Sequence, residues 1–394
     1  MQTFISKLPQ VGTSIFTEMS MLAHQHNAIN LSQGFPEFDA PELLKSEITK
    51  AIIDGKNQYS PANGLPDLLE QIASLIHRKY QTDFTDVAKV VGAKNITITS
   101  GATEALWVAI QTVVRPDDEV IIFDPAYDSY QPAIELAGGR CKRISLDAPD
   151  YKINWQVVKS QISSNTRAII INSPHNPTGT IMSADDMEKL QSIILENNLY
   201  LISDEVYEHI TFDGEDHQSA LRFPELFERA FVVSSFGKTF HCTGWKMGYC
   251  VAPTALSIEF RKIHQYVTFC SFTPAQIALT NMLANGKEHI DELSRFYQQK
   301  RDVLVKALSH SRFKILPSKG TYFVLLDYSD ISSKNDVEFC HYLTKEIGVA
   351  AIPLSPFYDP DTIENYQHHN KIIRLCFAKH EPTLLKAAEL LCQL

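Results

Sequence analysis

The sequence predicts an α/β protein in which a mainly parallel sheet lies between helices and a smaller α+β unit follows. Three observations predict this fold. Apolar runs of four or five residues in the middle of the chain do not alternate with polar residues, which is typical of strands buried on both faces. Amphipathic stretches such as residues 183–196 separate these runs, and this order indicates parallel strands joined by right-handed crossovers. After about residue 275 the pattern changes to that of an α+β unit.

The expected elements follow this division. The central unit has a short strand at 97–99, an apolar-periodic helix at 105–114, and strands at 119–123, 168–172, 199–203, 231–235 and 247–251. The C-terminal unit has a long helix from 274 to about 308, strands at 314–316 and 321–327, a helix at 336–346, strands at 349–353 and 371–378, and a final helix. The first 40 residues are expected to be irregular and to pack against this unit.

Composition and charge exclude several classes of function. The 394 residues include 36 basic and 46 acidic side chains, a formal net charge of −10. Such an acidic chain is a poor candidate for general nucleic-acid or anionic-membrane binding, so an anion must bind in a local pocket. No apolar run approaches the roughly 18 residues that span a bilayer, and the N-terminal residues lack the apolar stretch of a secretory signal.

The cysteines and histidines give no sign of a metal site. The seven cysteines are scattered and never spaced CxxC, so we expect buried thiols in a reducing cytoplasm instead of disulfides or zinc ligands. The pairs His24/His26 and His368/His369 have no nearby carboxylate or cysteine partners and are expected to be surface residues.

Candidate site residues follow the strands, because open α/β sheets bind ligands beyond the carboxyl ends of their strands. Gly101, Ala102 and Thr103 begin a helix, where small residues leave backbone N–H groups open to an anion; an ordinary capped helix is the alternative. Asp204 directly follows a buried strand, where its carboxylate needs a cation or hydrogen-bond donors. A protonated heterocyclic nitrogen would meet that need, and a helix N-cap is the alternative.

Three basic residues and one loop complete the pattern. Lys238 follows a strand and is flanked by Gly237 and aromatic residues, which favours a lowered pKa and a nucleophilic amine. Lys246 lies eight residues later, between glycines; a solvated surface charge is the alternative for either lysine. Asn176 lies in a loop that two prolines and a glycine make rigid. Arg374 lies inside an apolar strand, where a ligand carboxylate or an internal salt bridge would neutralise it.

The order and spacing of these motifs resemble the fold-type I pyridoxal-phosphate (PLP) aminotransferases over essentially the whole chain. The motifs are Asn-Pro-x-Gly from Asn176, Asp-x-x-Tyr from Asp204, Ser-x-x-Lys from Ser235, a basic residue eight positions later and a late arginine. Residues 30–36, Tyr59 and 235–240 are most similar to the kynurenine/glutamine aminotransferase branch, and residues 203–210 and 234–253 to its bacterial methionine aminotransferase members.

The resemblance implies a PLP-transferase fold of type I, with a seven-stranded sheet in the large domain and PLP as cofactor. Lys238 would bond to PLP and move the substrate proton, Asp204 would pair with the ring nitrogen, and Tyr207 and Asn176 would bond the phenolic oxygen. Tyr127 would stack on the ring. The phosphate would bind a set of residues that includes one from a second subunit: Gly101, Ala102, Thr103, Ser235, Lys246 and the partner's Tyr59. Family members with arginine at position 246 have a bidentate fork that Lys246 lacks.

The resemblance also implies where the substrate binds. Arg374, with the backbone of Gly34 and with Asn176, would hold the α-carboxylate. Phe16, Phe35 and Phe269, the last from the partner subunit, would line the side-chain pocket. No arginine matches the position that reads a second carboxylate, so methionine, phenylalanine, tyrosine or leucine is favoured over aspartate.

The predicted function is therefore that of a cytoplasmic, homodimeric aminotransferase that moves an amino group from such an amino acid to a 2-oxo acid by a ping-pong mechanism. A PLP-dependent cysteine-S-conjugate or cystathionine β-lyase is the alternative, because the two reactions diverge only after proton removal. A regulator that retains PLP without turnover is the third hypothesis. The predicted units are an N-terminal arm and part of the small domain at 1–45, a large PLP-binding domain at 46–280 and a small domain at 281–394.

Overall fold

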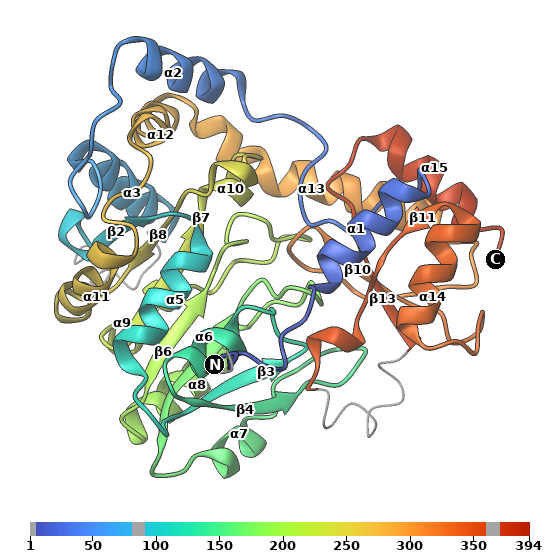
Figure 1. Cartoon of the computed structure of the whole chain (residues 1–394), viewed down its shortest axis with the longest axis horizontal. Coiled ribbons are helices and arrows are strands. Elements are labelled where there is room, and N and C mark those ends of the chain that lie inside the picture. The colour runs from blue at the N-terminus through green and yellow to red at the C-terminus, as the bar shows by residue number, and fades with distance from the viewer. Residues whose placement is uncertain (1–4, 81–90, 360–370) are drawn as a thin grey trace.

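A seven-stranded mixed sheet forms the centre of the molecule (Figure 1). The computed structural model describes residues 5–80, 91–359 and 371–394. In sheet order the strands are β2 (Ile96–Thr99), β8 (Gly248–Val251), β7 (Ala230–Ser235), β6 (Tyr200–Asp204), β5 (Thr166–Asn172), β3 (Glu119–Asp124) and β4 (Arg140–Ser145). Every strand except β8 runs in the same direction, which confirms the predicted mainly parallel sheet.

Two details of this sheet differ from the prediction. β8 is antiparallel to both neighbours, because residues 236–247, which connect it to β7, contain only short helical turns and no crossover helix. β4 was not predicted, because it is an edge strand with three basic residues and has no apolar run.

Helices cover both faces of the sheet. Alternate strand residues such as Val120 and Ile122 pack against α5 (Ala102–Val113), α6 (Tyr130–Leu136) and α11 (Thr254–Val267). Their neighbours Ile121 and Phe123 belong to the core on the opposite face. The helices that contribute to that core include α2 (Glu42–Ile53), α3 (Pro66–Lys79), α7 (Trp155–Gln161), α8 (Ala184–Glu196), α9 (Pro224–Phe227) and α12 (Thr273–Asn285). Burial on both faces explains the continuous apolar runs in the sequence.

The expected long helix from 274 to 308 is two helices, α12 and α13 (Lys287–Ala307). Gly286 ends the first and donates its N–H to the carbonyl of Met282 at 2.8 Å. Glycine is a poor residue for a helix interior and a common one at a helix end, so the break occurs there.

A four-stranded antiparallel sheet forms the C-terminal unit, in the order β12 (Ile352–Pro353), β13 (Ile372–Cys376), β10 (Phe323–Asp327) and β9 (Lys314–Ile315). The helical elements around it are α14 (Asp336–Tyr342), the π-helical turn η4 (Leu343–Ile347), η5 (Ser355–Phe357) and α15 (Glu381–Leu391). The remaining short 3₁₀ turns are η1 (Ala93–Asn95), η2 (Ala220–Arg222) and η3 (Thr243–Trp245).

The N-terminal segment joins this C-terminal unit. β1 (Ile29–Asn30) pairs in parallel with β11 (Val349–Ala350), and α1 (Ile15–Gln25) lies beside them (Figure 1). The expectation of an irregular segment is wrong for α1, whose N-cap Ser14 accepts a hydrogen bond from the Thr17 N–H. The domain boundaries at residues 45 and 280 remain our proposal.

Candidate active site

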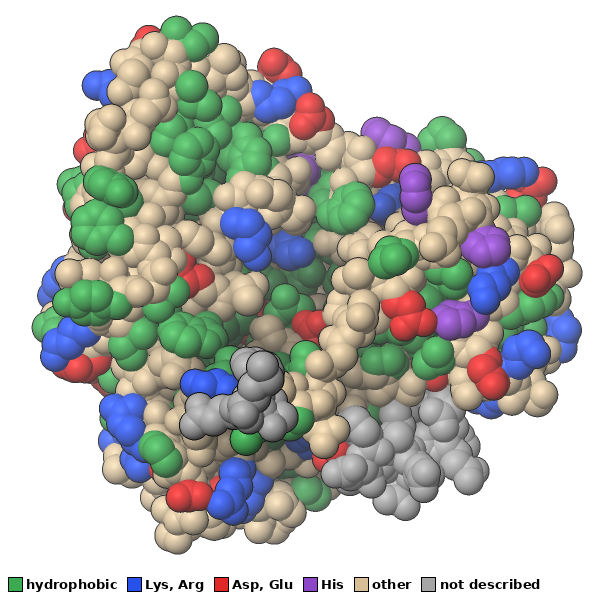
Figure 2. All heavy atoms as spheres, in the orientation of Figure 1, with side chains coloured by type: hydrophobic (Ala, Val, Ile, Leu, Met, Phe, Trp, Pro, Cys, Tyr) green, Lys and Arg blue, Asp and Glu red, His purple; other side chains and the backbone are tan. Residues whose placement is uncertain are grey.

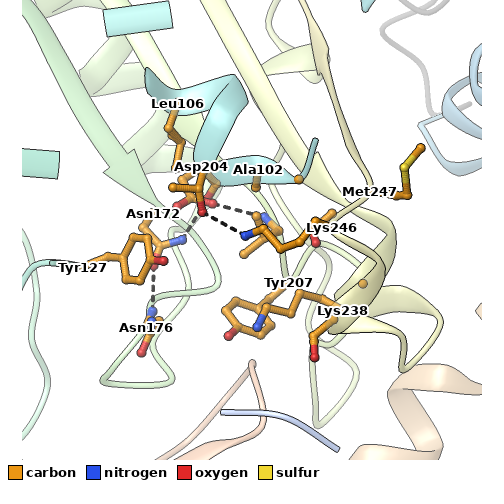
Figure 3. Close-up of a pocket in the computed structure, with 16 residues that line it drawn as sticks. Ala102, Leu106, Tyr127, Asn172, Asn176, Asp204, Tyr207, Lys238, Lys246 and Met247 are labelled. Atoms are coloured by element: carbon orange, nitrogen blue, oxygen red, sulfur yellow. Dashed lines mark hydrogen bonds between the residues drawn. The ribbon is translucent and has the colours of Figure 1, made fainter. Parts of the chain in front are cut away.

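A cavity of about 150 Å³ opens where β2, β6 and β7 end (Figure 3). All the predicted cofactor residues except Tyr59 line this cavity: Gly101, Ala102, Thr103, Tyr127, Asn176, Asp204, Tyr207, Ser235, Lys238 and Lys246. Leu106, Asn172, Val206, Gly237, Thr243 and Met247 complete the lining. Side chains that are far apart in the sequence therefore meet at one edge of the sheet.

The N-terminus of α5 forms one wall of the cavity and has the character of an anion site. Gly101 precedes the helix with φ of 82°, a conformation that favours glycine, and the first N–H groups of α5 follow it. The Lys246 Nζ lies 3.5 Å from Thr103 Oγ1. A Cβ on Gly248 would lie 2.9 Å from the Ala102 nitrogen, so only glycine lets β8 approach the helix start this closely.

Asp204 is buried, with 3% of its surface exposed, at the end of β6. The Tyr130 hydroxyl donates to Asp204 Oδ2 at 2.6 Å, and burial raises the pKa of Asp204 to about 6. The turn that follows is not a helix, which excludes the N-cap alternative. No Lys or Arg side chain of the described residues forms an ion pair with this carboxylate. It can therefore accept a hydrogen bond from a protonated nitrogen of a ligand.

Lys238 lies in α10 (Phe236–Thr239), directly after β7. Burial, together with the positive charges of Lys246 and Arg374, lowers the pKa of its amine to about 8. The Nζ donates to the Tyr322 hydroxyl at 2.8 Å and to the Gly34 carbonyl at 3.3 Å. A surface-charge role is thereby excluded for Lys238, and the lowered pKa gives its amine a larger neutral fraction for nucleophilic attack than a solvated lysine has.

Arg374 lies in β13 with only 1% of its surface exposed. Its guanidinium donates to Asn176 Oδ1 at 2.7 Å and to the Ser32 carbonyl at 3.2 Å. Among the described residues, its Nε has no hydrogen-bond partner and no carboxylate lies within 4.0 Å of its nitrogens, so the internal salt bridge is not found there. Burial lowers the pKa of Arg374 to about 10. A buried guanidinium without an ion-pair partner favours the binding of a carboxylate ligand.

Aromatic rings surround this guanidinium. Its Cζ lies 3.9 Å from the ring centre of Phe323, 5.3 Å from that of Phe16 and 5.4 Å from that of Phe357. Phe35 is 46% exposed, and the Lys379 Nζ lies 4.8 Å from its ring centre.

Tyr59 and Phe269 lie outside the cavity of the single chain. Tyr59 is 83% exposed and Phe269 43% exposed, and their rings contact each other edge to face at 5.2 Å. The structure therefore does not bring these two residues to the predicted site.

Sequence reasoning missed three polar residues of the site. Tyr130 bonds Asp204, Asn172 accepts the Asn176 N–H at 2.7 Å, and Tyr322 bonds Lys238. The loop after β3 contains both Tyr127 and Tyr130, which was a usable signal for Tyr130. Tyr322 precedes a C-terminal strand, and nothing in its local sequence indicates contact with Lys238.

The residues present fit PLP. An anion cradle at α5, a buried carboxylate and a lysine amine of lowered pKa match its phosphate, its ring nitrogen and its aldehyde, respectively. Arg374, which donates to the cavity-lining Asn176 at 2.7 Å, is the buried cation that a substrate carboxylate would need.

The remaining expectations concern residues away from the cavity. All seven cysteines are free thiols, but the expectation of buried thiols is wrong for exposed Cys392 and for the partly exposed Cys141 and Cys270. Cys392 is at the C-terminal end of α15, where the chain meets solvent. His24 and His26 are exposed as predicted, and His368 and His369 lie outside the described residues. No helix in the described ranges has the length and apolarity to cross a bilayer.

Comparison with known proteins gives matches over nearly the whole chain. The family model for aminotransferase class I and II matches residues 26–389. The chain is 54% identical to methionine aminotransferase of Escherichia coli strain K12, over 99% of this chain and 98% of that protein. It is 33% identical to kynurenine–oxoglutarate transaminase of Dictyostelium discoideum, over 97% of this chain and 94% of that protein. A crystal structure from Escherichia coli, reported with a methionine aminotransferase function, superposes with a TM-score of 0.93 at 53% identity and covers 100% of both chains.

Proposed function

Since this chain belongs to the aminotransferase class I and II family, whose members use PLP, we propose that it moves the amino group of methionine, or of an aromatic or large apolar L-amino acid, to a 2-oxo acid by a ping-pong mechanism. The family, the fold class and the cofactor agree with the sequence predictions. The substrate, the role of each residue, the dimer and the cytoplasmic location are our proposals.

We assign the cofactor contacts as follows. The α5 N-terminus, Thr103, Ser235 and Lys246 hold the phosphate, and Tyr127 packs on the ring. The Asp204 carboxylate accepts a hydrogen bond from the protonated ring nitrogen, and the burial of Asp204 strengthens that hydrogen bond. Tyr207 and Asn176 bind the phenolic oxygen.

Bound PLP supplies an electron sink for the pair of electrons left when the substrate Cα–H bond breaks. The protein's own contribution is acid–base chemistry and orientation. Lys238 would hold the cofactor and, once the substrate amine has displaced it, its free amine would accept and carry the Cα proton. The lowered pKa supports this role, because a base must be unprotonated near neutral pH. Arg374 fixes the α-carboxylate so that the Cα–H bond faces the lysine.

The observation that carries the substrate proposal is the buried guanidinium of Arg374 among the rings of Phe16, Phe323 and Phe357. An α-carboxylate bound there leaves the substrate side chain beside an apolar surface. Among the described residues that line the cavity, the cations are Lys238 and Lys246, and both are assigned to the cofactor. A second carboxylate on the substrate would lack a partner and would lose binding free energy. The name of the Escherichia coli relative supports methionine as one such substrate.

The exposure of two predicted site residues supports the proposed homodimer. Tyr59 and Phe269 contact each other and are exposed, and other large apolar side chains close to them in the sequence are also exposed, namely Ile52, Ile53, Tyr266 and Phe272. Figure 2 shows hydrophobic side chains gathered over the region of α2, α12 and α11. Large apolar patches of this kind mark interaction surfaces. We propose that a second copy covers this face and receives Tyr59 and Phe269 into its own site.

The experiment that tests the proposal combines a donor panel with peptide mapping. Purified enzyme is assayed with methionine, phenylalanine, tyrosine, leucine, aspartate and glutamate against one broad 2-oxo acid acceptor. We expect kcat/KM for the apolar donors to exceed that for aspartate and glutamate by about tenfold or more. Borohydride reduction followed by mass spectrometry is expected to place the cofactor on Lys238.

Three outcomes would contradict parts of the proposal. A preference for aspartate or glutamate would contradict the substrate class. Pyruvate and ammonia released from a β-substituted amino acid, without any need for an acceptor, would favour the β-lyase. A monomer at micromolar concentration in sedimentation experiments would contradict the dimer.

A further inference from the structure

We propose that Tyr322 is a positioning residue for Lys238. Its hydroxyl and the Gly34 carbonyl bind the amine of Lys238 whenever that amine is not bonded to the cofactor, and they turn its lone pair into the cavity. This inference rests on the proposed role of Lys238 as the lysine that bonds PLP and moves the Cα proton.

The hydrogen-bond directions carry the inference. The Tyr322 hydroxyl donates to the Gly34 carbonyl at 2.6 Å, which uses its only proton. The same oxygen, 2.8 Å from the Lys238 Nζ, must therefore accept from the amine. The Gly34 carbonyl, 3.3 Å from Nζ, is a second acceptor. A neutral amine that donates its two hydrogens to these two oxygens keeps its lone pair free, and a base needs that lone pair.

The neutrality of Tyr322 matters as much as its position. Its ring is fully buried against Phe323, Tyr207 and Tyr297, with ring centres 4.9 to 5.6 Å apart, and burial keeps its pKa well above the usual range. A carboxylate at this place would stabilise the ammonium form of Lys238 and raise its pKa. A neutral phenol orients the amine and favours its charged form much less. Tyr322 thus positions the base without keeping it protonated.

The chain connections place this contact on the substrate-binding side of the site. Tyr322 directly precedes β10, and its carbonyl accepts the Phe377 N–H at 2.9 Å, just beyond β13. β10 pairs with β13, so that Leu325 lies opposite Arg374. The acceptor of the lysine amine and the proposed binder of the substrate carboxylate therefore belong to one sheet. Their spacing sets where the amine rests relative to the substrate Cα.

The test uses Tyr322→Phe, which removes the hydroxyl and keeps the ring, with Tyr297→Phe as its matched control. Tyr297 is also fully buried, its ring centre lies 5.6 Å from that of Tyr322, and its hydroxyl has no hydrogen-bond partner among the described residues. Both holoenzymes are converted to the aminated form of the cofactor, which leaves Lys238 free. Trace labelling with acetic anhydride between pH 6 and pH 11, followed by mass spectrometry, then measures the pKa of Lys238 directly.

We expect Tyr322→Phe to lower the pKa of Lys238 by about one unit, because the ammonium form loses an acceptor. With the best donor of the panel, we expect kcat to fall about tenfold to a hundredfold and KM to stay within about twofold, because Arg374 still binds the carboxylate. The deuterium isotope effect at Cα is expected to rise, as proton transfer becomes slower. Tyr297→Phe is expected to match the wild type in all three measurements.

Each other result overturns the inference. If Tyr322→Phe behaves as Tyr297→Phe does, the hydroxyl has no positioning role, although the proposed function stands. If Tyr322→Phe alone fails to fold, the role of Tyr322 is structural. If mapping finds the cofactor on a lysine other than Lys238, the proposed site fails and this inference fails with it.

Discussion

The close approach of Gly248 to the start of α5 makes Gly248→Ala a quantitative test of the proposed phosphate cradle. A Cβ on Gly248 would lie 2.7 Å from the Ser234 carbonyl oxygen and 2.9 Å from the Ala102 nitrogen. Non-bonded heavy atoms rest about 3.5 Å apart, so these backbone atoms must move by roughly 0.6 to 0.8 Å. The φ of Gly248 lies outside the left-handed region, so the strain is steric and acts on the cradle itself.

Two magnitudes follow from this displacement. Overpacking of this kind costs about 1–3 kcal/mol of folding free energy. A shift of more than half an ångström at the Ala102 N–H also misaligns a charge-assisted hydrogen bond to a phosphate, which contributes about 1.5–3 kcal/mol. We therefore expect PLP to bind Gly248→Ala about ten- to a hundredfold more weakly than the wild type.

The assay titrates cofactor-free protein with PLP and follows absorbance, with a thermal unfolding scan for each variant. Gly244→Ala is the matched control, because Gly244 lies in the connection that leads into β8 and a Cβ there would meet nothing within 4 Å. It should bind PLP as the wild type does. Equal PLP affinity in Gly248→Ala and Gly244→Ala would refute the assignment of the α5 N-terminus to the phosphate.

Three further predictions concern single residues. Because burial raises the pKa of Asp204 from its ordinary value of 3.8 to about 6, the free energy of unfolding of the cofactor-free protein falls as the pH rises between those values. In chemical denaturation, Asp204→Asn should be more stable than the wild type by about 2–3 kcal/mol at pH 7 and equally stable below pH 4. Equal stability at pH 7 would disprove the burial argument. Arg374→Lys keeps the charge but loses the planar fork over Phe323, so kcat/KM should fall about a hundredfold for every donor; a loss confined to one donor would mean that Arg374 reads the side chain. Tyr59→Phe should weaken PLP binding about tenfold without changing the unfolding temperature, and wild-type affinity would remove Tyr59 from the cradle.

Local sequence determined much of the candidate site, because its residues lie in short segments at strand ends. A strand buried on both faces must be apolar, so the polar residues that end it, such as Asp204 and Lys238, stand out. The parallel order of β3, β5, β6 and β7 then brings these ends to one edge. This geometry explains why the sequence was enough to predict that Asn176, Asp204, Lys238 and Lys246 meet.

The missed features depend on partners that are distant in the sequence. Tyr322 reaches Lys238 only because β10 and the Gly34 segment fold back over the sheet edge. The direction of β8 depends on how tightly residues 236–247 turn, and an apolar run reads the same in either direction. β4 is an edge strand with one protected side, so it needs no apolar run. The proposed roles of Tyr59 and Phe269 require a second copy of the chain, and contacts within one chain do not show how two copies associate.

The reversal of β8 has a consequence for how the enzyme tolerates change. Because β7 and β8 are joined by residues 236–247 alone, Lys238 and Lys246 sit on a single short span of backbone. Lys238, proposed to bond the cofactor, and Lys246, proposed to bind its phosphate, are therefore positioned by the same connection. An insertion or deletion in this span would displace Lys238 and Lys246 together, so both proposed cofactor contacts would be lost at once. The length of this span therefore sets the positions of both proposed cofactor contacts together.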